Sequence, residues 1–392
     1  MASKSFSGII TPLEVMLSSF EDFIEKRLTD HETKSLKRSL KSSNQNAVDF
    51  TSNDYLGLAR STALFNSIQE KVKSIGATNG STGSRLLSGN SAYTETVENK
   101  LSQIFQTPST LLFNSGYTAN LAVLSALPQK DDTIIYDELA HASIKDGARL
   151  SLAKRYSFKH NNLDDLEAKI RKSQGKIYVA VEAYYSMDGD ACPLGDLIDL
   201  ASKYDVFLIV DEAHSTGVVG ENGSGLVAAL GATDKIPIRI HTFGKAMGVH
   251  GACVAGSEKL REYMINFARP FIYTTALPVH SIASIDCAFE FLRANIDLQR
   301  KLQDVVTYYI EQTRTLMNRT RSQSSIQTVI IPGNEQIKNV ARMLQEKKLD
   351  VRPILAPTVP KGMERLRICL HTFNTRSEID ELTHHLGTLS IT

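Results

Sequence analysis

The sequence predicts an α/β fold: a mostly parallel central sheet flanked by helices, with a smaller C-terminal α+β domain and an N-terminal helical segment. Strand and helix patterns alternate from about residue 110 to 255, an order that is typical of parallel sheets. The strand patterns are apolar without period-two alternation, as expected for strands buried on both faces. After Pro270 the alternation ends and long helical patterns follow, which predicts the separate smaller domain.

The chain begins with a predicted amphipathic helix. Thr11 can cap it, Pro12 suits its first position, and Glu14 completes a capping box. We expect this helix to pack on something larger or on a second subunit, and a polar linker to follow over residues 29–45. The predicted domains are residues 1–47 (N-terminal helix and linker), 48–278 (large α/β domain) and 279–392 (small α+β domain).

Apolar runs and turn residues predict the remaining elements. The expected strands of the large domain are residues 48–58, 111–113, 133–136, 177–182, 206–211 and 236–240. A helix is expected after residue 90, after 114, after 141 and over 194–204. In the small domain we expect helices over roughly 279–294 and 302–317, a strand near 328–331, a helix over 337–344 and a strand at 366–370. A last helix is expected to be capped by Ser377, with Asp380 three positions on.

Composition excludes several classes of protein. With 44 basic and 43 acidic residues, the near-zero net charge argues against nucleic acid as the main partner. The first residues lack an apolar signal core, no stretch approaches the ~20 apolar residues of a membrane span, and the last three residues are not the peroxisomal tripeptide. Four scattered cysteines lack metal-ligand spacing, so we predict reduced thiols, no metal and a cytoplasmic location.

The stretch over residues 241–251 carries the first chemical signal. Lys245 stands among glycines after a strand pattern, at the end of a strand where open α/β sheets place ligands. A desolvated lysine has a lowered pKa, so its amine could form a Schiff base with a carbonyl cofactor. A Walker A loop is excluded because Ala246 follows the lysine and Arg239 stands at its first glycine. The alternative is a surface lysine in a glycine turn.

Upstream strand ends supply matching groups. Asp211 could pair with a protonated pyridine nitrogen and His214 with a phenolic oxygen, although a helix N-cap and a core histidine are the alternatives. The Ser115-Gly116 junction between a strand and a helix offers free amides and a helix dipole to a phosphate. The glycine-rich loop over residues 80–90 permits close approach to a ligand, or is a flexible surface loop.

Taken together, these motifs resemble the α-oxoamine synthases, pyridoxal 5'-phosphate (PLP) enzymes of fold type I, and most closely the oxononanoate synthase branch. The motifs run in family order from about residue 48 to 372. They are Ser52-Asn53-Asp54-Tyr55-Leu56-Gly57, the 80–89 loop, Asn114-Ser115-Gly116-Tyr117, His141-Ala142-Ser143, Ser186-Met187-Asp188-Gly189-Asp190, Asp211-Glu212-Ala213-His214-Ser215-Thr216-Gly217, Thr242-Phe243-Gly244-Lys245 and Pro357-Thr358-Val359-Pro360-Lys361-Gly362.

The resemblance implies roles around the cofactor. Lys245 would bind PLP as a Schiff base and later transfer protons, Asp211 would hold the pyridine nitrogen, and His141 would stack on the ring and touch the substrate. The other implied contacts are Ser186 and His214 on the cofactor, the amides of Gly116 and Tyr117 with Thr242 on the phosphate, and Thr274 and Thr275 on the phosphate of a neighbouring subunit. The resemblance therefore implies a homodimer with shared active sites.

It also implies substrate contacts. Arg367 would anchor the amino-acid carboxylate, a group that guanidinium binds in a bidentate way, unless it is an exposed sheet residue. Asn53 and Thr358 match substrate contacts of the family. Arg27 could meet the acyl substrate, but Arg38 competes with it and a solvated charge is a third interpretation.

The implied reaction is decarboxylative condensation of an α-amino acid with an acyl thioester, in the leading hypothesis L-alanine with pimeloyl-CoA. Alternatives are a relative that uses glycine, serine or another acyl-CoA or carrier-protein donor, and a non-catalytic partner subunit. Leu355-Ala356 stands where biotin-pathway members carry an arginine and a proline, and Val249-His250 replaces smaller residues. These departures leave the acyl substrate and the role of His250 open.

Overall fold

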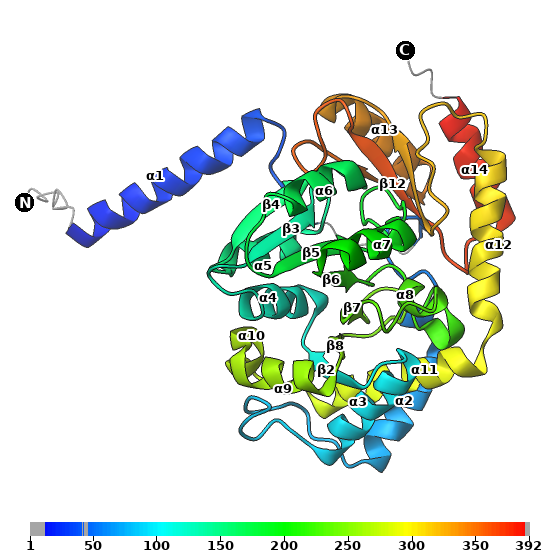
Figure 1. Cartoon of the computed structure of the whole chain (residues 1–392). Coiled ribbons are helices and arrows are strands. Elements are labelled where there is room, and N and C mark those ends of the chain that lie inside the picture. Colours follow the sequence, from blue (N-terminus) through cyan, green and yellow to red (C-terminus); the bar gives the residue numbers. More distant parts are fainter. Residues whose placement is uncertain (1–11, 41, 43–45, 389–392) are drawn as a thin grey trace, which may run out of the picture.

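A seven-stranded sheet organises the computed structural model, which describes residues 12–40, 42 and 46–388 (Figure 1). The strand order is β2-β8-β7-β6-β5-β3-β4. The strands are β2 (Ser109–Phe113), β3 (Thr133–Asp137), β4 (Lys154–Phe158), β5 (Ile177–Glu182), β6 (Val206–Asp211), β7 (Ile238–Thr242) and β8 (Ala252–Gly256). In this order, the adjacent strands β7, β6, β5, β3 and β4 pair in parallel. Strand β8 is antiparallel to both of its neighbours, β2 and β7. The predicted mostly parallel sheet is confirmed.

Helices cover both faces of this sheet. One apolar cluster joins it to α4 (Gly116–Ala126), α5 (Ala142–Leu150), α9 (Glu258–Phe267) and α10 (Arg269–Ile272). The cluster on the opposite face includes α6 (Leu163–Ile170), α7 (Leu194–Tyr204) and α8 (Leu226–Ala229). A third cluster brings in α2 (Thr62–Ser74), α3 (Ala92–Ile104) and α11 (Val279–Ala294). Two short 3-10 helices, η1 (Leu58–Arg60) and η2 (Glu221–Gly223), lie in the connections.

A second, antiparallel sheet lies toward the C-terminus, with the order β11 (Arg352–Ile354), β12 (Arg365–Cys369), β9 (Ile326–Ile330). Around it lie α12 (Asp297–Gln312), α13 (Asn334–Glu346) and α14 (Arg376–Gly387). β1 (Val48–Asp49) pairs in parallel with β10 (Leu349–Asp350). The segment that precedes the large sheet therefore lies against the C-terminal part of the chain. The predicted domain boundaries remain a prediction.

Two predicted boundaries in the C-terminal part were wrong. The helix expected over 302–317 begins and ends earlier, as α12. Helix α14 is capped by Thr375, not by Ser377: the Thr375 hydroxyl accepts from the Glu378 amide and the Glu378 carboxylate accepts from the Thr375 amide. Thr375 has the extended backbone that an N-cap requires, with φ −83 and ψ 158, whereas Ser377 is already helical.

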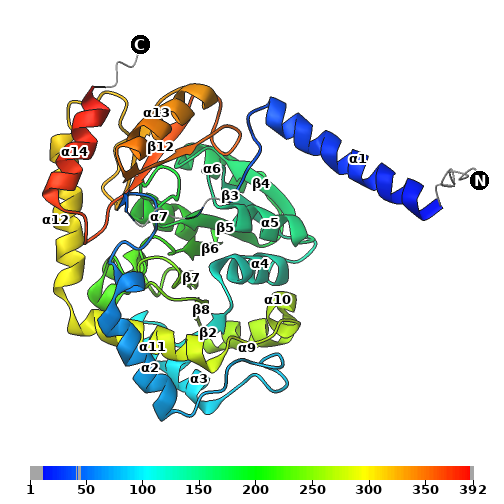
Figure 2. The same cartoon turned by 180° about the vertical axis from the view of Figure 1, so that it is seen from behind.

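Helix α1 (Pro12–Thr33) extends away from the rest of the chain in both views (Figures 1 and 2). It continues to Thr33, past the predicted start of the linker, and the predicted cap Thr11 lies outside the described residues. Phe20 and Phe23 are each 56% exposed, so packing on a second subunit remains a prediction for this helix. Among the helices that the structure describes, none has the length and apolarity to span a membrane.

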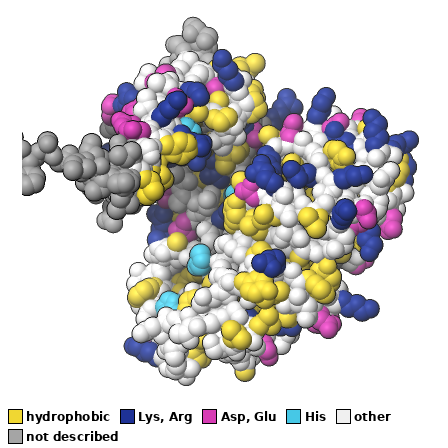
Figure 3. All heavy atoms as spheres, turned by 90° about the vertical axis from the view of Figure 1, so that its left-hand side faces the viewer, with side chains coloured by type: hydrophobic (Ala, Val, Ile, Leu, Met, Phe, Trp, Pro, Cys, Tyr) yellow, Lys and Arg dark blue, Asp and Glu magenta, His cyan; other side chains and the backbone are white. Residues whose placement is uncertain are grey.

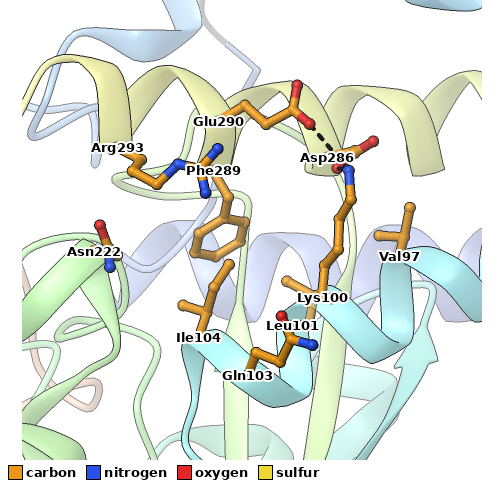
Figure 4. Close-up of a pocket in the computed structure, with 10 residues that line it drawn as sticks. All are labelled: Val97, Lys100, Leu101, Gln103, Ile104, Asn222, Asp286, Phe289, Glu290 and Arg293. Atoms are coloured by element: carbon orange, nitrogen blue, oxygen red, sulfur yellow. Dashed lines mark hydrogen bonds and ion pairs between the residues drawn. The ribbon is translucent and has the colours of Figure 1, made fainter.

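A charged cluster joins α11 to α2 and α3 beside a cavity of about 370 Å³ (Figure 4). The buried carboxylate of Asp286 accepts from Lys100 Nζ at 2.6 Å and from the Tyr93 hydroxyl at 2.8 Å, with Lys71 Nζ at 3.6 Å. Lys100 also reaches Glu290 at 3.0 Å, but Glu290 is 43% exposed. Asp286 therefore carries most of the electrostatic contact between these helices.

Asp286→Ala is expected to lower the free energy of unfolding by about 2 kcal/mol, because the Tyr93 hydroxyl and two lysines lose a buried acceptor. Glu290→Ala is the matched control, and the loss of its exposed ion pair should cost below ~1 kcal/mol. Denaturant unfolding of both variants measures the difference. Equal losses would contradict the importance assigned to the buried carboxylate.

Candidate active site

Lys245 lies in a tight loop directly after β7, at the carboxyl end of a parallel strand as predicted. Backbone bonds hold this loop: Phe243 N donates to Gly251 O at 2.9 Å, and Gly248 N donates to Lys245 O at 2.9 Å. Gly248 has φ +66, and a Cβ there would collide with the backbone of Ala59. The side chain of Lys245 borders a cavity of about 270 Å³.

Two carboxylates border the same cavity. β5 and β6 end in Glu182 and Asp211, which lie side by side in the sheet register. Asp211 accepts from Asn120 Nδ2 at 2.6 Å and from the Ala213 amide at 2.9 Å. No helix begins at Asp211, so the N-cap alternative was wrong. Glu182 accepts from the amide of His141 at 2.6 Å.

Burial and mutual repulsion set the protonation of these groups. Burial, with the charge of Asp211, raises the pKa of Glu182 to about 8. Burial lowers the pKa of Lys245, while Asp211 and Glu182 oppose that shift. The amine therefore loses its proton more readily than an exposed lysine, which is the requirement for a nucleophile.

An anion cradle lies at the start of α4. Ser115 caps this helix by accepting from the Thr118 amide at 3.2 Å. A Cβ on Gly116 would collide with the Thr242 hydroxyl, so only glycine permits this approach of helix and strand end. The first amides of a helix lack intrahelical acceptors and, with the helix dipole, favour a phosphate. Tyr117 follows in the first turn, and its hydroxyl donates to the Asp146 carboxylate.

His141 lines the cavity, is exposed to solvent and is the N-cap of α5. Its ring lies edge-on to that of Tyr117, with centroids 6.3 Å apart. Burial and the positive charge of Lys245 lower the pKa of His141, although Asp211 opposes the shift. A neutral imidazole here can stack on a flat ligand or accept a proton.

A chain of hydrogen bonds runs from Lys245 to the second sheet. Lys245 Nζ lies 2.9 Å from His214 Nε2, and His214 Nδ1 lies 2.8 Å from the Tyr55 hydroxyl. Tyr55 donates to Asn53 Oδ1 at 3.0 Å, and Arg367 Nη2 donates to the same oxygen at 2.9 Å. Burial, with the charge of Lys245, holds the pKa of His214 well below its usual value. His214 is therefore neutral, and each of its ring nitrogens makes a hydrogen bond, Nε2 with Lys245 and Nδ1 with Tyr55.

Arg367 is fixed from several sides. It lies on β12, and its Nε donates to the Ser186 carbonyl at 2.6 Å. The neighbouring Arg365 forms an ion pair with Asp188 in the same loop. Arg367 is thus not an exposed sheet residue, and it brings Asn53 and Ser186 together.

The structure does not bring every predicted residue to this cavity. Thr358 is exposed and borders a separate cavity of about 650 Å³ together with Arg38. Thr274 and Thr275 lie beside the Asn114 amide, which donates to the carbonyl of Thr275 at 3.0 Å. Arg27 lies 5.9 Å from the ring of Phe23 on α1. His250 does border the Lys245 cavity. The functional roles of all these residues remain predictions.

Sequence reasoning missed Glu182, Asn120 and Tyr55. Glu182 had a signal, since it ends a strand pattern next to the one that ends in Asp211. Tyr55 stands in a quoted motif, but nothing in its spacing predicts a bond to His214. Asn120 lies one turn into α4, where only the packing of that helix on the sheet reveals its contact.

The residues present fit the cofactor that the resemblance implies. The cavity offers an amine for an aldehyde, a carboxylate for a pyridine nitrogen, an imidazole, and a helix start whose Gly116 packs closely against the Thr242 hydroxyl. In addition, Asn120 Oδ1 is buried without a hydrogen-bond partner among the described residues, beside the Asp211 carboxylate. The arrangement can hold an aromatic aldehyde that carries a phosphate.

Comparison with known proteins gave consistent relatives. The sequence model of "Aminotransferase class I and II" matches residues 45–386. The 8-amino-7-oxononanoate synthase of Emericella nidulans is 40% identical, over 94% of this chain and 95% of its own. The structure of 8-amino-7-oxononanoate synthase from Francisella tularensis has a TM-score of 0.76 and 31% identity, covering 88% and 97% of the two chains. A serine palmitoyltransferase of S. paucimobilis with bound PLP has a TM-score of 0.84 and 25% identity, covering 94% and 96%.

Proposed function

Because the chain belongs to the aminotransferase class I and II family, and within it to the α-oxoamine synthases, we propose that it is a PLP-dependent acyltransferase with 8-amino-7-oxononanoate synthase activity. Its substrates are L-alanine and pimeloyl-CoA, and its products are the α-amino ketone, free CoA and carbon dioxide. The observation that carries this proposal is the 40% identity to an 8-amino-7-oxononanoate synthase over nearly the whole length of both chains.

The chain's own groups divide the work of this reaction. The start of α4 and Thr242 would hold the cofactor phosphate, and Asp211 would hold its pyridine nitrogen, since these groups line one cavity. When bound, PLP supplies an electron sink for the negative charge left after proton removal. Lys245 Nζ would bind the aldehyde and would be freed when the amino acid's amine replaces it; the free amine would then take the proton from the α-carbon and later return one to the product. The lowered pKa of Lys245 suits this role, because a general base works best when its pKa lies near the working pH.

The second sheet supplies the substrate end of the site. Arg367 binds the amino-acid carboxylate through a planar guanidinium already held by the Ser186 carbonyl and Asn53. His141 lines the cavity and is exposed to solvent, so it can meet the arriving acyl thioester. Thr358 lies apart from these groups, on a separate cavity, so its predicted substrate contact has no support in this geometry.

The chain works as a homodimer with shared active sites. Thr274 and Thr275 lie outside their own chain's Lys245 cavity, as residues that reach a neighbouring subunit's phosphate would. Helices α4, α5 and α10 lie on the side seen in Figure 3, where hydrophobic side chains form several patches. Exposed apolar residues next to these helices include Leu150 (61%), Leu152 (81%) and Tyr273 (72%). Such patches are typical of surfaces that another chain covers.

The choice of substrates is the finer part of this proposal. The likeness to serine palmitoyltransferase keeps serine and longer acyl chains as alternatives, and glycine or a carrier-protein donor remains open. A non-catalytic partner subunit is disfavoured because Lys245, Asp211 and His141 all border one cavity.

Product analysis tests the proposal. PLP-loaded protein is mixed with alanine, glycine or serine and with acetyl-CoA, pimeloyl-CoA or palmitoyl-CoA, and products are identified by mass spectrometry. We expect 8-amino-7-oxononanoate from alanine and pimeloyl-CoA at the highest kcat/KM. A spectral change with serine but not with alanine would exclude the oxononanoate assignment, and a protein that binds no PLP would exclude the family chemistry.

A further inference from the structure

The hydrogen-bond chain from Arg367 to Lys245 has a direction. Arginine only donates hydrogen bonds, so Arg367 Nη2 identifies the Asn53 atom that it contacts as the acceptor oxygen. Tyr55 lies 3.0 Å from that oxygen and must donate its single proton to it. The Tyr55 oxygen can then only accept from His214 Nδ1, which leaves Nε2 of the neutral ring without a proton. Nε2 therefore accepts from the amine of Lys245.

We propose that Tyr55 is a positioning residue: the direction in which its hydroxyl donates decides which nitrogen of His214 carries the ring proton. Through that choice, Tyr55 links the carboxylate site at Arg367 to the nitrogen of Lys245. This rests on the proposed function, in which Arg367 meets the amino acid and Lys245 the cofactor. A carboxylate that engages Arg367 changes the donor facing Asn53. If Asn53 stops accepting from Tyr55, the His214 ring proton can move from Nδ1 to Nε2. The Tyr55 hydroxyl then donates to the vacated Nδ1, and the neutral ring presents its one proton to Lys245 from Nε2.

The surroundings of Tyr55 favour such a switch over a passive packing role. Its side chain is 1% exposed, and it belongs to the apolar cluster that includes Phe243 and Met247 of the Lys245 loop. Burial and Cys369 raise the pKa of the Tyr55 hydroxyl, with Arg367 opposing, so the hydroxyl keeps its proton. The ionisable groups that act on the Lys245 amine, His214 or Tyr55 are Asp211, Glu182, Arg367, Cys369 and His141. Arg367 is itself hydrogen-bonded into the chain through Asn53, and Tyr55 is the link that continues the chain from Asn53 to His214.

A double-mutant cycle tests the proposal. The readout is the pH midpoint of the visible absorption band of the lysine-bound cofactor, measured without substrate, for the wild type, Tyr55→Phe, Arg367→Lys and the double variant. Arg367→Lys keeps the positive charge but changes the donor facing Asn53. We expect Arg367→Lys to shift the midpoint when it is introduced into the wild type. When it is introduced into the Tyr55→Phe variant, the shift should be less than half as large. Equal shifts in the two backgrounds would overturn the proposal.

Kinetics supply a second readout. Tyr55→Phe keeps the ring and its packing but leaves His214 Nδ1 buried without a partner, so kcat/KM for the amino acid should fall about tenfold. The matched control is Tyr309→Phe. Tyr309 is also fully buried, lies on α12, and its hydroxyl has no partner among the described residues. The midpoint of the absorption band and kcat/KM of Tyr309→Phe should stay at wild-type values. If Tyr55→Phe also keeps wild-type values, the proposal is wrong.

Two arrangements keep the test decisive. Asn53→Ala breaks the same chain one link further on and should abolish the coupling equally, so it replaces Tyr55→Phe if that variant does not fold. The band midpoint requires bound cofactor but no acyl transfer. A wild type that binds PLP yet forms no product would contradict the proposed function, while the midpoint cycle would still decide the role of Tyr55.

Discussion

Lys245→Ala is expected to remove the visible absorption band of the lysine-bound cofactor and to lower kcat/KM by about 10³-fold or more. The variant loses the amine that binds the aldehyde and the base that moves the α-proton, and a positioned base alone contributes ~10²–10⁴-fold. The anion cradle at Gly116 and Thr242 is unchanged, so PLP should still bind, without a covalent bond. Absorbance after dialysis and steady-state kinetics measure the two effects.

The matched control is Lys235→Ala, which removes an exposed lysine before the same strand. It should keep both the band and the activity. Lys245→Arg separates charge from chemistry, because it keeps a cation beside Asp211 but cannot bind the aldehyde; we expect it to be as inactive as Lys245→Ala. An unchanged band in either Lys245 variant would place the cofactor on another residue and contradict the site described above.

The order of the elements and most cofactor groups could be predicted because each depends on local sequence. Lys245 and Asp211 end apolar strand patterns, and parallel strands that end at one sheet edge bring such residues together. Gly116 follows a strand and begins a helix, a junction whose chemistry is local. The sequence therefore predicted that Lys245, Asp211 and Gly116 lie together at one edge of the large sheet, although it missed Glu182 and Asn120 beside them.

Features that depend on distant packing were missed. β4 escaped prediction because it is an edge strand whose first four residues are exposed, so its polar sequence lacks the apolar run of a buried strand. β8 escaped because its small residues carry little strand signal and its antiparallel direction depends on its neighbours. Likewise, the bond between Tyr55 and His214 joins residues that are far apart in the chain and that only the packed core brings together.

Asp211→Asn should lower kcat about 10²- to 10³-fold while the visible band of the lysine-bound cofactor persists. The substitution keeps the side-chain size and an oxygen that can accept from the Ala213 amide, but it removes the charge that keeps the pyridine nitrogen protonated. Lys245 is untouched, so covalent binding of the cofactor remains. Because Asp211 raises the pKa of Lys245, its loss should move the pH midpoint of the band downward. Steady-state kinetics and a pH titration of the band measure both effects.

The pattern of losses distinguishes this role from simple destabilisation. Asp196→Asn, in the exposed first turn of α7, is the matched control and should keep kcat and the band midpoint. If Asp211→Asn misfolds the site, the band should be lost and KM should rise. If the variant only removes the charge opposite the cofactor's pyridine nitrogen, kcat should fall while the band and KM are kept. The pKa of Glu182 should also fall when its charged neighbour is removed, since Asp211 contributes to raising it. Wild-type kcat in Asp211→Asn would contradict the role assigned to Asp211.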